Sequence, residues 1–224
     1  MQLRFLGQSA FSLSDGDTAV LTDPFLTGNP RAAATAGELD AQAILLTHGH
    51  ADHLGDTVAI AKRTGATVLA VVELAHEIGR AGVDVVDPNL GGTITFDWGS
   101  VKLVPAFHTA VSPSGTPHIA AGLVIDFKGT TIYHLGDTCL FSDLALPGRA
   151  RKIDVALVPI GGHYTMDRHD AVEAVKLIGA ETVIPIHYDT FPPIETDAQA
   201  FKADVEAQTS SKVVVLAPGE SWSS

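Results

Sequence analysis

The segment Thr47–His53 concentrates residues that can bind metal ions. Its sequence, Thr-His-Gly-His-Ala-Asp-His, puts three histidines and one aspartate within six residues. Imidazole and carboxylate groups are the expected ligands of Zn²⁺ and other first-row divalent ions. The small residues Gly49 and Ala51 would let the loop fold tightly around such ions. A polar loop that is rich in histidine by chance is the alternative, but four ligand-type residues at this spacing are a specific signal of metal binding.

Other ligand-type residues follow apolar runs that have the composition of buried strands. They are His48 after residues 44–47, His108 after residues 103–107, Asp137 after residues 132–136 and His187 after residues 183–186. A buried strand holds the residue at its end rigidly, so binding sites gather where strands give way to loops. We expect these four strand ends to converge at one edge of the fold.

The elements that must hold these residues are mostly strands. Apolar runs and the alternation of apolar and polar residues, beginning with Leu3 and Phe5, indicate them along most of the chain. The predicted strands are Ala19–Thr22, Ala43–Thr47, Thr67–Val72, Thr93–Phe96, Val101–Ala106, Ile119–Phe127, Thr131–Leu135, Val155–Ile160, Thr182–Ile186 and Lys212–Leu216. Lys128-Gly129, between two of them, is predicted to form a hairpin turn.

Helices are predicted at fewer places. Leu54–Thr64 is expected to be helical and to end at Gly65, and Asp167–Ile178 has apolar residues at helical spacing. Thr196 and Gln199 have the spacing of a capping box for a third helix. This order of strands and helices predicts an α/β fold in which two β-sheets pack together with helices on the outer faces.

The composition is that of a globular protein. Of 224 residues, 46% are hydrophobic and 18% are charged, and no linker divides the chain, so we expect a single domain over residues 1–224. No run approaches the roughly 20 apolar residues of a membrane span. The N-terminus does not have the pattern of a signal peptide, which predicts a cytoplasmic protein.

Cysteine content and charge exclude several classes of site and partner. Cys139 is the one cysteine, so neither an internal disulfide nor a thiolate zinc site can form, and we expect Cys139 to pack as a small hydrophobe. The net charge is −12 and no basic stripe is visible, which argues against nucleic-acid binding. We expect a small-molecule substrate and neither a nucleic-acid nor a membrane partner, and a homo-oligomer remains open.

The order of the ligand-type residues resembles that of the metallo-β-lactamase superfamily. The resemblance runs from Asp23 to His187, which is most of the chain. It implies an αββα sandwich of two mixed β-sheets. It also implies two divalent ions, with Zn²⁺ expected first and Mn²⁺ or Fe²⁺ compatible with the same ligands. Asp23 would orient the metal-binding loop without contacting an ion.

The resemblance also implies how the ligands divide between the ions. One ion would take His48, His50 and His108. The other would take Asp52, His53 and His187. Asp137 would bridge both ions, and a hydroxide bridging them would be the nucleophile, so no serine or cysteine nucleophile is required.

A narrower resemblance points to small, stand-alone metal-dependent hydrolases related to ascorbate-phosphate lactonase. It rests on Leu6–Ala10 and on Pro159–Met166. That group often has histidine where this chain has Gln8, and asparagine where it has His163. The first departure bears on the wall of the pocket, and the second leaves open whether His163 contacts metal, substrate or neither.

Several residues have both a functional and a structural interpretation. Asp52, His163 and Tyr164 are the candidate catalytic residues. His163 is equally compatible with a hydrogen-bonded loop histidine, and a tyrosine such as Tyr164 is more often only a packed residue of the pocket wall. His134, inside a predicted strand, is expected to be a core or supporting residue. His118 has no assignment. We expect His76 and His169 to be solvent-exposed histidines of helices. The segment Phe191-Pro192-Pro193 is expected to form either a rigid rim of the pocket or a plain loop.

The sequence therefore predicts a dinuclear metal-dependent hydrolase of a small ester-type substrate: a phosphodiester, a lactone or a thioester. In each, a metal can stabilise charge that develops on an oxygen. A nuclease is the rival within hydrolases, but the negative charge and the lack of room for a nucleic-acid-grasping insertion argue against it. A non-catalytic metal-binding protein is the other alternative, and the complete ligand set argues against that.

Overall fold

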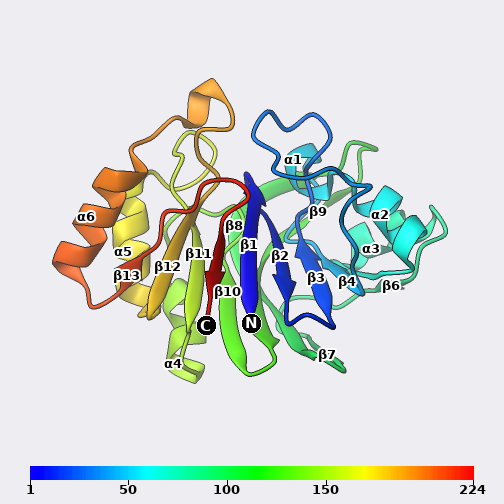
Figure 1. The fold of residues 1–224 in the computed structure, drawn as a ribbon, viewed down its shortest axis with the longest axis horizontal. Helices are drawn as coiled ribbons and strands as arrows, with labels where there is room; N and C mark the ends of the chain where they lie inside the picture. The colour runs from blue at the N-terminus through cyan, green and yellow to red at the C-terminus, as the bar shows by residue number, and fades with distance from the viewer.

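Two seven-stranded β-sheets pack face to face in the computed structural model, which describes residues 1–224 (Figure 1). From one edge to the other, the first sheet contains β14 (Ser221–Ser223), β1 (Gln2–Gly7), β2 (Ala10–Ser14), β3 (Ala19–Thr22), β4 (Ala43–Leu45), β5 (Thr67–Leu69) and β6 (Val85–Val86). The second contains β13 (Lys212–Val213), β12 (Thr182–Ile186), β11 (Val155–Pro159), β10 (Thr130–His134), β9 (Pro117–Phe127), β8 (Gly99–Val111) and β7 (Thr93–Phe96).

Both sheets are mixed. In the first sheet the pairs from β14 to β3 are antiparallel and the pairs from β3 to β6 are parallel. In the second sheet the pairs from β7 to β10 are antiparallel and the pairs from β10 to β13 are parallel. Because the ends of parallel strands face the same edge of a sheet, the loops that follow them gather at one end of the sandwich.

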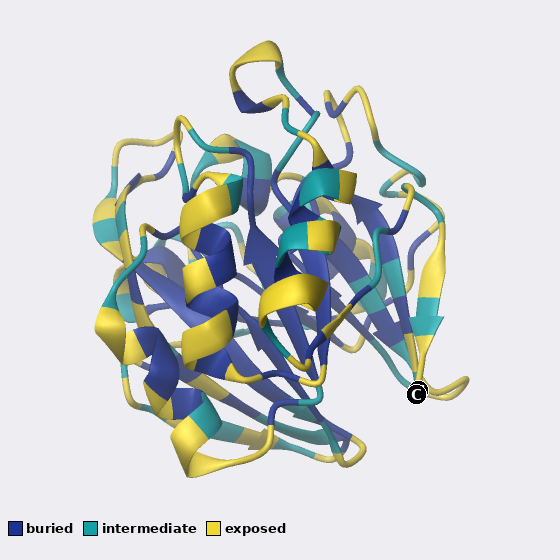
Figure 2. Ribbon diagram, turned by 90° about the vertical axis from the view of Figure 1, so that its left-hand side faces the viewer, coloured by how far each residue is buried: buried dark blue, intermediate teal, exposed yellow.

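Helices cover the outer faces of the two sheets. Figure 1 shows the α-helices on the two outer sides of the sandwich. They are α1 (Ala51–Leu54), α2 (Thr57–Thr64) and α3 (Val72–Gly79), then α4 (Ala145–Ala150), α5 (Arg168–Ile178) and α6 (Ala198–Gln208), with short 3₁₀ turns at η1 (Ser142–Leu144) and η2 (Pro192–Ile194). Their buried sides face the sheets (Figure 2). None of the helices has the length and apolarity needed to cross a membrane.

Two hydrophobic clusters follow from this layering. The larger has 38 buried residues and includes the space between the sheets, and the smaller has 20 and lies between the second sheet and its helices. Strand β10 contributes to both, because its side chains alternate: Ile132 belongs to the larger cluster and Tyr133 to the smaller. The predicted αββα sandwich is confirmed.

Most strand predictions are confirmed, and three have the observed bounds: Ala19–Thr22, Thr93–Phe96 and Thr182–Ile186. The hairpin turn at Lys128-Gly129 is also confirmed. Both of its residues have positive φ, 50° and 85°, as a two-residue hairpin turn requires.

Strands β2, β6 and β14 were not predicted. Among the predicted strands the largest difference in bounds is β8, which was predicted to end at Ala106 and continues to Val111. Its pairing with β9 shifts register between Pro105 and Thr109 and then resumes. The irregularity interrupts the alternation on which the prediction depended, and it includes His108.

Two helix predictions were wrong in detail. The helix predicted over Leu54–Thr64 is two helices, because Gly55 has a φ of 43° and separates α1 from α2. The capping box at Thr196 does not form. Asp197 caps α6 instead, since its side chain accepts the backbone N–H groups of Gln199 and Ala200.

Candidate metal centre

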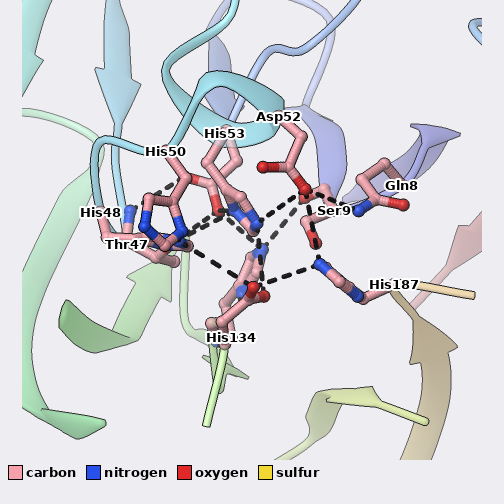
Figure 3. Close-up of polar contacts among 12 residues, drawn as sticks. Gln8, Ser9, Thr47, His48, His50, Asp52, His53, His134 and His187 are labelled. Atoms are coloured by element: carbon pink, nitrogen blue, oxygen red, sulfur yellow. Dashed lines mark hydrogen bonds and ion pairs between the residues drawn. The ribbon is translucent and has the colours of Figure 1, made fainter. Parts of the chain in front are cut away.

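The structure brings the ligand-type residues together at the loop end of the sandwich. His48 and His50 lie in the loop after β4, and Asp52 and His53 follow in α1. Figure 3 shows the side chains of this segment directed toward His187, which comes from the loop after β12. The remaining two are His108, from the irregular part of β8, and Asp137, from the loop after β10.

Three histidines form the first triad: His48, His50 and His108. Their possible ligand atoms all lie within 4.8 Å of one another. The Nδ1 atom of His50 lies 3.0 Å from Nε2 of His48 and 3.3 Å from Nε2 of His108. Three imidazole nitrogens directed at one point match the ligand chemistry of a divalent transition metal.

The second triad consists of Asp52, His53 and His187, whose possible ligand atoms also lie within 4.8 Å of one another. Oδ2 of Asp52 lies 3.7 Å from Nε2 of His53 and 3.5 Å from Nε2 of His187. This set adds a carboxylate to two imidazoles, so the two triads have different charge.

Asp137 lies between the triads. Its Oδ1 is 3.3 Å from Nε2 of His53, and its Oδ2 is 3.1 Å from Nε2 of His187. The same Oδ2 is 3.6 Å from Nε2 of His108 and 3.9 Å from Nε2 of His48. One buried carboxylate therefore faces imidazoles of both triads.

The donor set fits metal ions better than a network of hydrogen bonds alone. Nε2 of His53 and Oδ1 of Asp137 are buried and have no hydrogen-bond partner. Buried polar atoms are rarely left without a partner in a stable protein. Both atoms face the centre of the cluster, where a cation would satisfy them.

The two triads differ in protonation. Burial lowers the pKa of His48, His50 and His108, so the first triad is neutral at pH 7 and each ring keeps one nitrogen lone pair that can bind a metal ion. Burial also opposes charge on the second-triad histidines, but carboxylates outweigh it. Asp137 and Asp23 raise the pKa of His53 well above its usual value, and Asp137 raises that of His187 to about 9.

Both carboxylates of the centre are ionised. Burial opposes the charge of Asp137, but His187 and His53 together hold its pKa well below the usual range. Burial opposes the charge of Asp52 as well, and the hydrogen bond from His187 still lowers its pKa. The Asp52 side chain is 28% exposed and that of Asp137 is 3% exposed, so Asp52 is the carboxylate that faces the solvent side.

Asp23 holds the metal-binding loop in place through hydrogen bonds. It is fully buried, and its Oδ1 accepts the backbone N–H of Thr47 at 2.9 Å. Its Oδ2 accepts the Thr47 hydroxyl at 2.6 Å and lies 2.8 Å from Nδ1 of His53. With Nδ1–H of His53 donating to Asp23, Nε2 is left to face the cluster, which is the usual arrangement for a metal-bound histidine.

His134 supports the turn that carries Asp137. It is fully buried, its Nε2 lies 3.1 Å from the backbone oxygen of Ser9, and its Nδ1 accepts the N–H of Gly136. These bonds occupy both ring nitrogens, so His134 is a supporting residue and not a ligand, as its place in a strand predicted.

Sequence reasoning gave no role to His118, which holds the metal-binding loop from the side. Its Nε2 accepts the N–H of Gly49 at 2.8 Å, and its Nδ1 lies 3.1 Å from the backbone oxygen of Thr116. A Cβ at Gly49 would lie 2.7 Å from the side chain of Leu74 and 2.8 Å from the ring of His118. Position 49 therefore needs glycine.

Gln8 contacts Asp52. Its Nε2 donates to Oδ2 of Asp52 at 2.9 Å, and its backbone oxygen accepts the N–H of His187. The residue at which this chain departs from the lactonase-like group thus orients one member of the second triad and braces another. No local pattern in the sequence indicates either contact, because the partners are far apart along the chain.

Strained backbone is concentrated at this site. Six residues other than glycine have positive φ. Lys128 is in the hairpin turn, and the others lie at or beside the centre: Gln8, Asp23, His163, His187 and Asp189. Such conformations are unfavourable for L-residues and persist where the surroundings impose them, which occurs most often at functional sites.

A cavity of about 510 Å³ opens above the triads. Its walls include Phe25, Thr109, Tyr164, Phe191 and Pro193. The predicted pocket rim at Phe191-Pro192-Pro193 is therefore present in part.

Two residues that follow candidate site residues or strand ends in the sequence, His163 and Cys139, lie on the surface. His163 is exposed and does not line the cavity, and its ring packs edge-on against Tyr164 with 4.5 Å between centroids. Cys139 is exposed, so the expectation that it packs as a small hydrophobe was wrong. It follows Asp137 in the loop beyond β10, where the chain has left the core.

The chain matches known proteins over nearly its whole length. The family model for the beta-lactamase superfamily domain matches residues 2–187. A UPF0173 metal-dependent hydrolase of Pelotomaculum thermopropionicum is 47% identical, and one of Thermus thermophilus is 46% identical, with at least 97% of each chain covered. Among solved structures, a metallo hydrolase from the archaeon Ignicoccus hospitalis is 36% identical with a TM-score of 0.90, covering 99% of this chain and 97% of its own.

Proposed function

The chain belongs to the β-lactamase superfamily domain family, and from this premise we propose that it is a hydrolase that uses two divalent ions to cleave a small ester-type substrate. The relatives that it resembles are named metal-dependent hydrolases. Phosphodiesters, lactones and thioesters are the candidate substrates, and Zn²⁺ is the first metal to test, followed by Mn²⁺ and Fe²⁺.

One observation supports a dinuclear centre above all others. Asp137 is a buried carboxylate whose two oxygens lie 3.3 Å from Nε2 of His53 and 3.6 Å from Nε2 of His108. It therefore faces both triads. His48, His50 and His108 would hold one ion, Asp52, His53 and His187 the other, and Asp137 both. When bound, such a pair of ions supplies Lewis acidity and an acidified water.

The protein's own groups have separate tasks in this proposal. Asp52 is ionised and is the more exposed carboxylate, so its Oδ atoms would accept the proton of the attacking water and return it to the leaving oxygen. Gln8 would fix the orientation of Asp52 through the 2.9 Å hydrogen bond. Tyr164 lines the cavity, and its hydroxyl would donate a hydrogen bond to an oxygen of the substrate.

The test is an activity screen of the metal-loaded protein and two variants over a bis-aryl phosphodiester, an aryl-substituted lactone and an acyl thioester. Asp137→Ala should lower kcat/KM by at least about 100-fold, since even partners outside the ligand set are worth roughly 10–100-fold. His76→Ala is the matched control: His76 is exposed and pairs with Asp87, away from the cavity.

Wild-type turnover of at least one substrate, lost in Asp137→Ala and kept in His76→Ala, is the expected result. Equal turnover by all three proteins would contradict the proposal, because the centre would then not be the site of the reaction. Cleavage of a structured RNA with no turnover of any small substrate would favour a nuclease instead.

A further inference from the structure

From the walls of the metal cavity we infer that the substrate is an uncharged ester or lactone that carries an aromatic or branched apolar group. The inference rests on the proposed hydrolase function and narrows it. It separates the carboxylic esters from the phosphodiesters among the candidate substrates.

Aromatic side chains from three separate loops surround the mouth of the cavity. Phe25 follows β3, Tyr164 follows β11 and Phe191 follows β12, and all three line the cavity with Pro193. The rings of Phe25 and Phe191 have centroids 6.4 Å apart and planes tilted by 34°. Phe25 and Phe191 are half-buried and Tyr164 is 55% exposed, so their faces remain available to a bound group.

The position of Phe25 is fixed by the chain around it. Oδ2 of Asp56 accepts the backbone N–H groups of Leu26 and Thr27 at 3.0 and 2.8 Å. Gly55 lies against the same loop, and a Cβ there would be 2.4 Å from the backbone oxygen of Pro24. The backbone that carries the ring is therefore held in place at the mouth before any ligand arrives.

Phe191 and Tyr164 are held in the same way. The N–H of Ile194 donates to the backbone oxygen of Phe191 at 3.0 Å, and the N–H of Asp189 donates to that of Ile194 at 3.0 Å. The turn of Tyr164 is closed by the N–H of Gly162, which donates to the backbone oxygen of Met166 at 2.9 Å. A preformed apolar wall binds an apolar group without an ordering cost.

Charge at the cavity disfavours an anionic substituent. None of the 11 residues that line it is lysine or arginine. The nearest arginine in the sequence after Tyr164 is Arg168, which forms an ion pair with Asp204 and does not line the cavity. A carboxylate or phosphate on the arm of a substrate, away from the ions, would lose water against aromatic rings, and no lysine or arginine side chain lines the cavity to pair with it.

A binding experiment tests the inference without depending on turnover. Hydroxamates chelate divalent ions, so the metal-loaded protein is titrated with acetohydroxamate, 3-phenylpropanohydroxamate and the para-carboxylate of the latter. Burial of the phenyl ring should tighten binding by roughly 30-fold over acetohydroxamate. The added carboxylate should remove most of that gain.

Variants of the protein test whether the aromatic wall causes the tighter binding of the phenyl probe. Phe191→Ala should reduce the advantage of the phenyl group to below roughly fivefold, with the affinity for acetohydroxamate unchanged. Phe96→Ala is the matched control, since the Phe96 ring stacks on Trp98 and does not line the cavity. It should keep the full advantage. Metal content is measured in each variant, so that loss of ions is not mistaken for loss of an apolar wall.

The outcomes separate this inference from the proposed function. Equal affinity for the methyl and phenyl probes, tighter binding of the carboxylated probe, or no binding of any probe would overturn the inference. Faster turnover of a phosphodiester than of any aryl ester or lactone would also overturn it, while the hydrolase function would stand. The expected order of probe affinities with no hydrolysis of any ester-type substrate would contradict the function and support the apolar mouth.

Discussion

Residues of both triads line the same cavity, but the triads differ in the groups that surround their histidines and in the protonation of those histidines. The first triad consists of histidines alone, and burial lowers their pKa values. The second contains Asp52, and its histidines face Asp137 and Asp23, which raise the pKa of His53 and of His187. One half of the centre is neutral and the other is a set of ion pairs.

In the proposed dinuclear centre, this difference in protonation predicts that the two halves bind metal by different routes. Neutral imidazoles of the first triad can take an ion at once. In the second triad an ion must replace protons that the carboxylates hold in place, because a ligand histidine must be neutral. Asp137 joins the halves, since it is the acidic partner of one and faces a histidine of the other.

The largest effect is expected from Asp137→Ala, which removes the group common to both halves. Metal content should fall by more than one ion per chain, and His134→Ala should keep most of its metal because His134 only supports the turn. Elemental analysis after dialysis against excess Zn²⁺ measures both. Equal loss of metal in the two variants would show that Asp137 is not a ligand shared by both halves.

Variants of a single triad should remove one ion each. His108→Ala should leave the second triad able to bind, and His187→Ala should leave the first, because neither histidine belongs to the other set. Each variant should therefore retain about one ion per chain when saturated. If either variant lost all of its metal, the triads would not be separate half-sites.

The pH dependence of binding should differ between these variants. In His108→Ala, an ion displaces the proton of His187, whose pKa is raised to about 9, and the proton of His53, whose pKa is also raised, so affinity should rise with pH between pH 7 and pH 9. In His187→Ala, the first-triad histidines have lowered pKa values, so affinity should change little between pH 7 and pH 9. Competition with a chromophoric chelator measures both, and parallel pH profiles would contradict the comparison.

A smaller effect is expected from His118, which braces only the first half through Gly49. His118→Ala should weaken binding of one ion by roughly tenfold, the low end of the range for partners outside the ligand set. His118→Gln should recover part of the loss, because an amide oxygen can also accept the N–H of Gly49. Weakening of both ions alike would assign His118 to general stability.

The fold was largely predictable because its strands are continuous apolar runs with clear turns. Thr182–Ile186 and the Lys128-Gly129 turn depend on local residue types alone, and local reasoning located them. The break between α1 and α2 was missed. It depends on the close approach of Gly55 to a distant loop, where a Cβ at position 55 would lie 2.4 Å from the backbone oxygen of Pro24. Local residue types do not show such a contact.

The site was predictable to the same extent. Residue types located the ligand-type residues, and strand ends located them except for His108, which lies within β8. The order of these residues along the chain supplied the division into two triads by resemblance. The bracing groups were not predictable, because Gln8 meets Asp52 and His118 meets Gly49 across long stretches of sequence. The aromatic mouth was missed in part for the same reason: Phe25 and Phe191 come from opposite sheets.

The central claim, that one centre holds two ions in unlike halves, is tested most directly by metal stoichiometry. The wild-type protein is stripped with chelator, saturated with Zn²⁺ at pH 8 by equilibrium dialysis, and analysed for metal and protein in the same sample. The account predicts two ions per chain, bound in two resolved steps. Saturation at one ion or fewer per chain would contradict it.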